Sequence, residues 1–131
     1  MVIVDTTVWI DYLNGTSTAQ TVWLDAELAR QRLGLTDLIL CEILQGVRDD
    51  QQAKQTRHEL MKFEVFEAGG VPLAIAAAQN YRLLRARGHT TRKTIDCWIA
   101  TFCLTNDHAL LHNERDYDPF EEFLSLRVVH P

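Results

Sequence analysis

The sequence lacks the features that mark membrane and secreted proteins. No apolar run approaches the roughly 18–20 residues that a bilayer span needs, and the start of the chain has neither a basic segment nor a long apolar segment. We therefore expect a cytoplasmic protein with no membrane association. No repeat, low-complexity tract or linker interrupts the 131 residues, so the sequence predicts a single domain over residues 1–131.

Cysteine and histidine are too sparse for a disulfide scaffold or a zinc finger. The three cysteines, Cys41, Cys97 and Cys103, form no CxxC motif and stand among apolar residues, so we expect reduced thiols in the core. His108 and His112 are four residues apart, but the apolar stretch between them predicts a strand. In a strand this spacing does not make the ligand pair that zinc binds on a helix.

Positive charge is also scarce. The chain has 13 Lys and Arg against 18 Asp and Glu, a formal charge of −5, which argues against a general nucleic-acid binder. The charges are unevenly distributed, however. Residues 68–95 hold five cations and no acid, which leaves eight Lys and Arg against 18 Asp and Glu in the rest of the chain. One basic segment therefore interrupts an acidic protein.

Short apolar runs alternate with helical patterns along the whole chain. Five of these runs are predicted strands: residues 2–4, 33–35, 63–66, 109–111 and 127–129. Strands that alternate with helices predict an α/β fold. We expect a mostly parallel central sheet of about five strands with helices on both faces.

Two carboxylates interrupt helical segments that are otherwise apolar. Glu42 follows Leu38 and Ile39 on one helix face, and Asp96 precedes Ile99 on another, so both acids are expected to point inward. A buried carboxylate must be protonated, paired with a base or bound to a metal. The alternatives are a buried arginine pair for Glu42 and compensation of the helix dipole for Asp96.

Further acids follow predicted strands, where open parallel sheets bind their ligands. Asp5 comes directly after the first strand, although it also suits the cap of the next helix. Asp116 and Asp118 follow a late strand, although both are also typical turn residues. Carboxylates that converge at one sheet edge need a cation. An oxygen-only ligand set favours Mg²⁺ or Mn²⁺, which often act on phosphate esters.

Four segments in order resemble the motifs of PIN-domain ribonucleases, specifically the VapC-type toxins of bacterial toxin–antitoxin pairs. They are Val2–Asp11, Leu38–Gly46, Thr94–Ala100 and Asn113–Tyr117. The resemblance extends from residue 2 to residue 117 and implies a single PIN-like domain. It also implies an endoribonuclease that depends on Mg²⁺ or Mn²⁺ and leaves 5′-phosphate and 3′-hydroxyl ends.

The resemblance assigns roles to five residues. Asp5, Glu42 and Asp96 match the most constant acids of the family, and Asp116 matches an acid that precedes an aromatic residue. It implies that these four acids are catalytic and bind the metal. Thr7 matches a Ser, Thr or Asn position whose side chain would contact a ligand or a metal-bound water.

The last motif departs from the family pattern. Many relatives have Asp where Asn113 or Glu114 stands, so the fourth carboxylate could be Glu114, Asp116 or Asp118. Asn113 remains a candidate ligand through its amide oxygen or through water.

The resemblance also implies partners: a tRNA or rRNA substrate, a VapB-type antitoxin, a second copy in a homodimer, and operator DNA contacted only through the antitoxin. Within the basic segment, Arg92 and Lys93 come just before Asp96. Cations beside a metal cluster suit phosphate contacts, so these two are predicted to flank the RNA backbone. The alternative is an ordinary solvated surface.

Three other interpretations fit less well. A phosphoacceptor receiver domain needs a lysine after a late strand, and none of the three lysines follows an apolar strand. A haloacid-dehalogenase-like phosphatase needs Asp-x-Asp after the first strand, but Thr7 holds the second position. A non-catalytic PIN-like interaction module has no need for several inward carboxylates.

Overall fold

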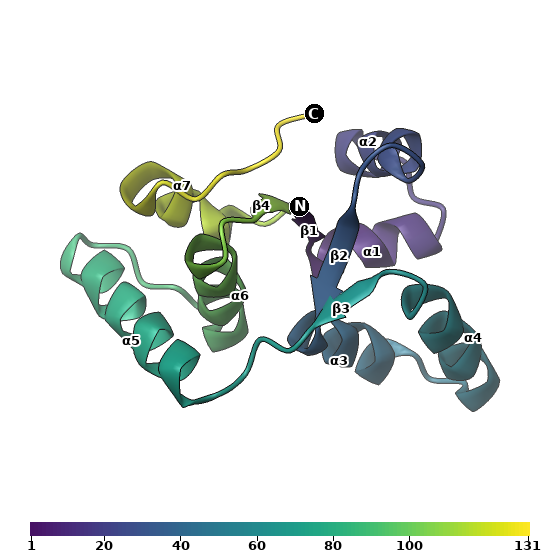
Figure 1. Cartoon of the computed structure of the whole chain (residues 1–131), viewed down its shortest axis with the longest axis horizontal. Helices are drawn as coiled ribbons and strands as arrows, with labels where there is room; N and C mark the ends of the chain where they lie inside the picture. Colours follow the sequence, from purple (N-terminus) through teal and green to yellow (C-terminus); the bar gives the residue numbers. More distant parts are fainter.

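Four parallel strands form the central sheet in the computed structural model, which describes residues 1–131. They are β1 (Val2–Val4), β2 (Leu33–Thr36), β3 (Glu64–Phe66) and β4 (Ala109–Leu111). Their order in space is β3-β2-β1-β4 (Figure 1). The predicted parallel α/β sheet is confirmed, with four strands in place of about five.

The predicted strand at residues 127–129 is reduced to an isolated parallel bridge. Val128 faces Leu110, with the Leu110 N–H donating to the Arg127 carbonyl and the Val129 N–H donating to the Leu110 carbonyl. Just before this bridge, the Leu126 N–H donates to the Phe120 carbonyl and so keeps the chain at the end of α7. Too little extended chain remains to form a longer ladder.

Helices lie on either side of the strands (Figure 1). α1 packs against α2 and α3, and α3 packs against α4, whereas α5 packs against α6 and α7. The helical segments are α1 (Thr6–Leu13), α2 (Ala19–Glu27), α3 (Asp37–Gly46), α4 (Asp50–Leu60), α5 (Val71–Ala86), α6 (Thr94–Thr105), the 3₁₀ turn η1 (Arg115–Tyr117) and α7 (Asp118–Leu124). None of these helices has the length and apolar character that a membrane crossing requires.

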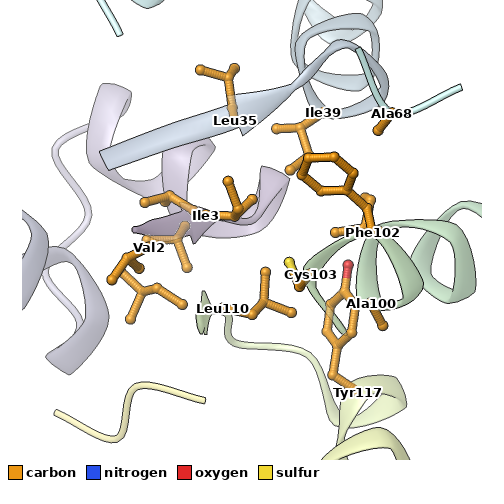
Figure 2. Close-up of a cluster of buried hydrophobic side chains, with 14 of the residues drawn as sticks. Val2, Ile3, Leu35, Ile39, Ala68, Ala100, Phe102, Cys103, Leu110 and Tyr117 are labelled. Atoms are coloured by element: carbon orange, nitrogen blue, oxygen red, sulfur yellow. The ribbon is translucent and has the colours of Figure 1, made fainter. Parts of the chain in front are cut away.

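The core lies where the strands meet α3 and α6. Strands that are covered on both faces are buried along their whole length, as β1 and β2 are. Figure 2 shows Ile3 and Leu110 near Cys103 of α6, whereas Leu35 points to the other side of its strand. Cys97 and Cys103 are buried as predicted, but Cys41 is exposed. The prediction for Cys41 is wrong because α3 buries only its Ile39 and Ile43 side, and Cys41 lies on the opposite side.

The order of the strands indicates where a ligand site is expected. From β1 the chain passes to β2 on one side, and only after β3 does it cross to β4 on the other side of β1. The carboxyl ends of β1 and β4 therefore flank the point where the direction of winding changes. This is the position where open α/β sheets hold their ligands.

Candidate functional site

Asp5 stands directly after β1 and is only 3% exposed. Its carbonyl accepts from the N–H groups of Val8 and Trp9 at the start of α1, but its side chain makes no capping bond. The carboxylate instead accepts from the Tyr117 hydroxyl, 2.8 Å from Oδ1, and from the Thr7 hydroxyl, 3.3 Å from Oδ2. Asp5 therefore occupies the N-cap position of α1, as the alternative predicted, but its side chain is bound by Tyr117 and Thr7 at the edge of the sheet.

Asp96 lies in the first turn of α6 and is 5% exposed. Its Oδ1 is 3.4 Å from the Tyr117 hydroxyl, and its Oδ2 is buried without a hydrogen-bond partner. The position in the first turn agrees with dipole compensation. A carboxylate that served only the helix dipole would remain solvated, however, whereas this one is buried beside Asp5.

Glu42 is half-buried on α3 and faces the start of α1. Its Oε1 accepts from the Thr6 hydroxyl at 2.7 Å. None of the ion pairs in the structure involves Glu42, so the alternative of a buried arginine pair is wrong. The consecutive hydroxyls of Thr6 and Thr7 therefore bind two different acids.

Electrostatic coupling joins these acids into a group. The pKa of Asp5 is raised from 3.8 to about 6, mainly by burial and also by the charge of Glu42, against hydrogen bonds that lower it. Burial also raises the pKa of Asp96 from 3.8 to about 7, and the charges of Asp5, Glu42 and Glu114 act in the same direction. We call Asp5, Glu42, Asp96 and Glu114 the acid cluster.

Tyr117 is a site residue that the sequence analysis missed. The side chain is fully buried, and its hydroxyl lies between the carboxylates of Asp5 and Asp96. Figure 2 shows the ring beside α6 near Ala100. Burial and the two carboxylate charges raise the pKa of Tyr117 well above its usual value, so the hydroxyl keeps its proton. The available signal was a tyrosine in the last motif, since a buried tyrosine hydroxyl normally has a partner.

The remaining acids of the last motif differ in their surroundings. Asp116 in η1 accepts from Arg92 at 3.3 Å, while its Oδ2 is buried without a partner. Asp118 is exposed at the start of α7. Asn113 is exposed in the loop after β4, and its side chain forms no hydrogen bond with any cluster acid.

The two predicted phosphate contacts are exposed beside the cluster. Lys93 precedes the first turn of α6, and its charge lowers the pKa of Asp96. Arg92 holds Asp116 in an ion pair. A cavity of about 320 Å³ adjoins this pair and has no hydrophobic lining; it is bordered by Gly88, His89, Thr90, Thr91, Arg115, Asp116 and Pro119.

The donor chemistry of the acid cluster fits a hard divalent cation. No three acidic, histidine or cysteine side chains surround one point closely enough to enclose an ion. Mg²⁺ does not need such a cage, because it is usually held by one or two carboxylates and keeps several waters. The buried and unpartnered Oδ2 atom of Asp96 is a ligand atom of the required kind.

Comparison with known proteins gave consistent matches. The family model described as PIN domain matches residues 2–122. Ribonuclease VapC11 of Mycobacterium tuberculosis is 26% identical over 131 residues, which cover 98% of both proteins. The solved structure of VapBC2 from Rickettsia felis, bound to a DNA fragment from their promoter, has a TM-score of 0.75 at 13% identity and 98% coverage of each chain. VapBC-1 from nontypeable Haemophilus influenzae has a TM-score of 0.75 at 16% identity, covering 98% of this chain and 97% of the other.

Proposed function

This chain belongs to the PIN-domain family, and from that premise we propose that it is a divalent-metal-dependent endoribonuclease and the toxin of a VapBC-type toxin–antitoxin pair. The ribonuclease name of its relative from Mycobacterium tuberculosis supports the activity. The VapBC complexes among the solved structures support the pairing with an antitoxin. All these matches extend over nearly the full length of the chain.

The observation that carries the proposal is the close pairing of Asp5 and Asp96 around one hydroxyl. Both carboxylates are buried, and each lies within 3.4 Å of the Tyr117 hydroxyl oxygen. Two neighbouring buried carboxylates repel each other when both are ionised, unless a cation lies between them. The pairing is unfavourable when no cation is bound and would be stabilised by a divalent ion, which supports a metal-dependent hydrolase.

Asp5 and Asp96 would hold the Mg²⁺ or Mn²⁺ ion, with Glu42 positioning it or a second ion. When bound, such an ion supplies Lewis acidity toward a phosphoryl oxygen and lowers the pKa of a coordinated water. The protein residues orient these acids: the Thr7 hydroxyl binds Asp5, and the Thr6 hydroxyl binds Glu42 at 2.7 Å. The strand end and the two helices on which the acids stand exclude bulk water from one side of the site.

Glu114 and Asp116 are the two candidates for the fourth carboxylate in this proposal. The charge of Glu114 acts on Asp96, which supports Glu114 as the fourth carboxylate of the cluster. Asp116 retains one buried oxygen without a partner and would bind the ion from the margin once Arg92 turns away from it. The exposure of Asp118 argues against it as the fourth carboxylate.

We propose that Arg92 and Lys93 contact the RNA backbone on the open side of the cluster, where both are exposed. Thr7, beside Asp5, and Asn113, in the loop after β4, would contact the substrate or ordered water. The proposed substrate is a tRNA or an rRNA loop, since proteins read RNA mainly at unpaired bases and by shape. Mapping the cleaved 5′-phosphate ends across cellular RNA would identify it.

The proposed assembly is a homodimer bound to a VapB-type antitoxin, with operator DNA contacted through the antitoxin. The acidic composition outside residues 68–95 supports docking of a basic antitoxin segment. Light scattering of the purified chain, alone and with the protein encoded beside it, would measure both associations.

The direct test is cleavage of total tRNA by the purified chain. We expect cleavage with Mg²⁺ or Mn²⁺ and none after EDTA is added. Asp96→Asn keeps the shape of the side chain but removes its charge, so we expect the rate to fall at least about 100-fold. Metal binding without any cleavage would instead favour a non-catalytic interaction module.

Asp25→Asn is the matched control, because Asp25 is exposed on α2 and the one hydrogen bond of its side chain comes from the Tyr12 hydroxyl. The control should cleave at the rate of the unmodified chain. An Asp96→Asn variant that cleaves as fast as this control would remove Asp96 from the proposed site.

A further inference from the structure

We infer that Tyr117 is a positioning residue for the proposed cation site: its hydroxyl fixes the Asp5 and Asp96 carboxylates so that one Asp96 oxygen stays free for the ion. This inference rests on the proposed metal-dependent function. It assigns a role to a side chain that carries no charge and that the acidic pattern of the motifs does not reveal.

The hydroxyl lies between the two acids at unequal distances. The Tyr117 oxygen is 2.8 Å from Asp5 Oδ1 and 3.4 Å from Asp96 Oδ1. A hydroxyl has one hydrogen to donate, so the stronger bond goes to Asp5. The longer contact still orients Asp96, because its Oδ1 shares the same hydroxyl with Asp5.

The four oxygens of the two carboxylates therefore differ in their hydrogen bonding. Asp5 is bound on both sides, by Tyr117 at Oδ1 and by Thr7 at Oδ2. Asp96 has one oxygen directed at Tyr117 and a second, Oδ2, that is buried without a partner. An ion that approached the pair would therefore meet one Asp96 oxygen that has no hydrogen-bond partner, and Asp5 oxygens that each keep a second lone pair.

The Tyr117 ring cannot move to follow a displaced carboxylate. It is fully buried and packs against the His112 ring with 4.8 Å between centroids. His112 Nδ1 accepts from the Glu114 N–H at 3.1 Å, and the Tyr117 N–H donates to the Glu114 carbonyl at 3.2 Å. These two bonds hold the backbone of the loop after β4 on either side of Glu114, and Figure 2 shows the Tyr117 ring beside α6.

Groups that hydrogen-bond to metal ligands commonly contribute 10–100-fold to metal affinity because they fix ligand orientation. Tyr117→Phe keeps the ring that fills the core and deletes only the hydroxyl. We expect the dissociation constant for Mn²⁺ to rise about tenfold, measured by electron paramagnetic resonance of the free ion. Cleavage by the variant should recover when Mn²⁺ is raised to saturation.

Tyr12→Phe is the matched control. It also removes a tyrosine hydroxyl from an aspartate, since the Tyr12 hydroxyl donates to Asp25 at 3.2 Å on the surface. The Mn²⁺ affinity of this control should equal that of the unmodified chain, and circular dichroism should report the same fold for both variants.

Two results would overturn the role of Tyr117. One is an unchanged Mn²⁺ affinity in Tyr117→Phe, and the other is a loss of cleavage that saturating Mn²⁺ does not restore. Failure of the proposed function is recognised separately, because the unmodified chain would then bind no Mn²⁺ or would bind it without cleaving RNA.

Discussion

Asp96 is the residue whose ionisation opposes folding most directly. Its pKa is raised from 3.8 to about 7 by burial first and then by the charge of Asp5, and burial raises that of Asp5 to about 6. Between about pH 4 and pH 7 the folded chain holds protons that the unfolded chain has already released. In the absence of metal, the free energy of unfolding should therefore fall as the pH rises through this window.

Asp96→Asn isolates the contribution of this residue. A pKa raised from 3.8 to about 7 corresponds to a cost of roughly 4 kcal/mol for the ionised side chain, before screening by solvent reduces it. The amide introduces polar groups that also lack partners, so we expect a net gain of about 2 kcal/mol in the free energy of unfolding at pH 8. At pH 5, where Asp96 is protonated in the fold, the gain should be small. Urea unfolding in EDTA at both pH values measures the difference.

The same substitution should thus stabilise the fold and abolish the proposed activity, a trade-off that is typical of catalytic residues. Asp25→Asn, on the surface of α2, should change the urea midpoint equally little at both pH values. A variant of Asp96 that is no more stable than the unmodified chain at pH 8 would contradict the strain assigned to this carboxylate.

Among the elements, β2 is constrained by a glycine. Gly34 pairs with Glu64 of β3, and a Cβ at this position would lie 2.9 Å from the Glu64 carbonyl oxygen and 3.1 Å from both Met1 Sδ and Phe66 Cε2. The carbonyl cannot yield without disturbing the pairing of β2 with β3. We expect Gly34→Ala to lower the free energy of unfolding by about 1–3 kcal/mol, measured by urea denaturation.

Gly46→Ala supplies the comparison, because nothing lies within 4 Å of a Cβ at the end of α3. Alanine there should be neutral or should stabilise the helix by up to about 1 kcal/mol. Equal effects of the two substitutions would show that loss of backbone freedom, and not the close approach of β3, decides the role of Gly34.

The elements of this fold were predictable because each strand is a short apolar run followed by a helical pattern. The segment at residues 127–129 has the same β-branched character, yet it forms one bridge. Its pairing depends on where α7 ends and in which direction the chain then runs, and no local sequence pattern encodes this. Helical periodicity correctly predicted that Asp96 is buried.

The contacts within the site were less accessible to prediction. Tyr117 reaches Asp5 across 112 residues, and Thr6 reaches Glu42 across 36. Such pairs depend on the packing of whole elements. Position alone also misleads: Asp37 follows β2 as Asp5 follows β1, but its side chain accepts from the backbone N–H groups of Leu38 and Ala68. One acid thus serves the loop before α5, and the other serves the site.

Over the whole molecule, the net charge of −5 is the sum of one basic segment and an acidic remainder. The basic segment is α5 and the loop that leads to α6, and Arg92 and Lys93 end it beside the acid cluster. Arg85 and Arg87 lie over the rings of Tyr81 and Phe123, at 5.7 and 5.2 Å. Arg92 binds Asp116 and the charge of Lys93 acts on Asp96, so these are the two cations of the segment for which we propose contact with RNA phosphates.

Charge reversal tests this arrangement. Arg92→Glu with Lys93→Glu should weaken binding of labelled tRNA in EDTA and reduce the slope of log affinity against log salt. Each lost phosphate contact reduces the slope by about 0.7–0.9, so we expect a change of about 1.5 for the pair. EDTA keeps the RNA intact and separates binding from any effect that the altered charges have on the cation site.

Lys54→Glu with Arg57→Glu makes the same change of net charge on α4, where both side chains are exposed. Figure 1 shows α4 on the opposite side of the molecule from α5. If net charge alone governed binding, both double variants would lose affinity equally. We expect the α4 variant to keep nearly the full salt slope, because RNA engaged at the acid cluster contacts the cations that border it and leaves α4 free. An unchanged slope in the Arg92 and Lys93 variant would exclude this surface from the RNA interface.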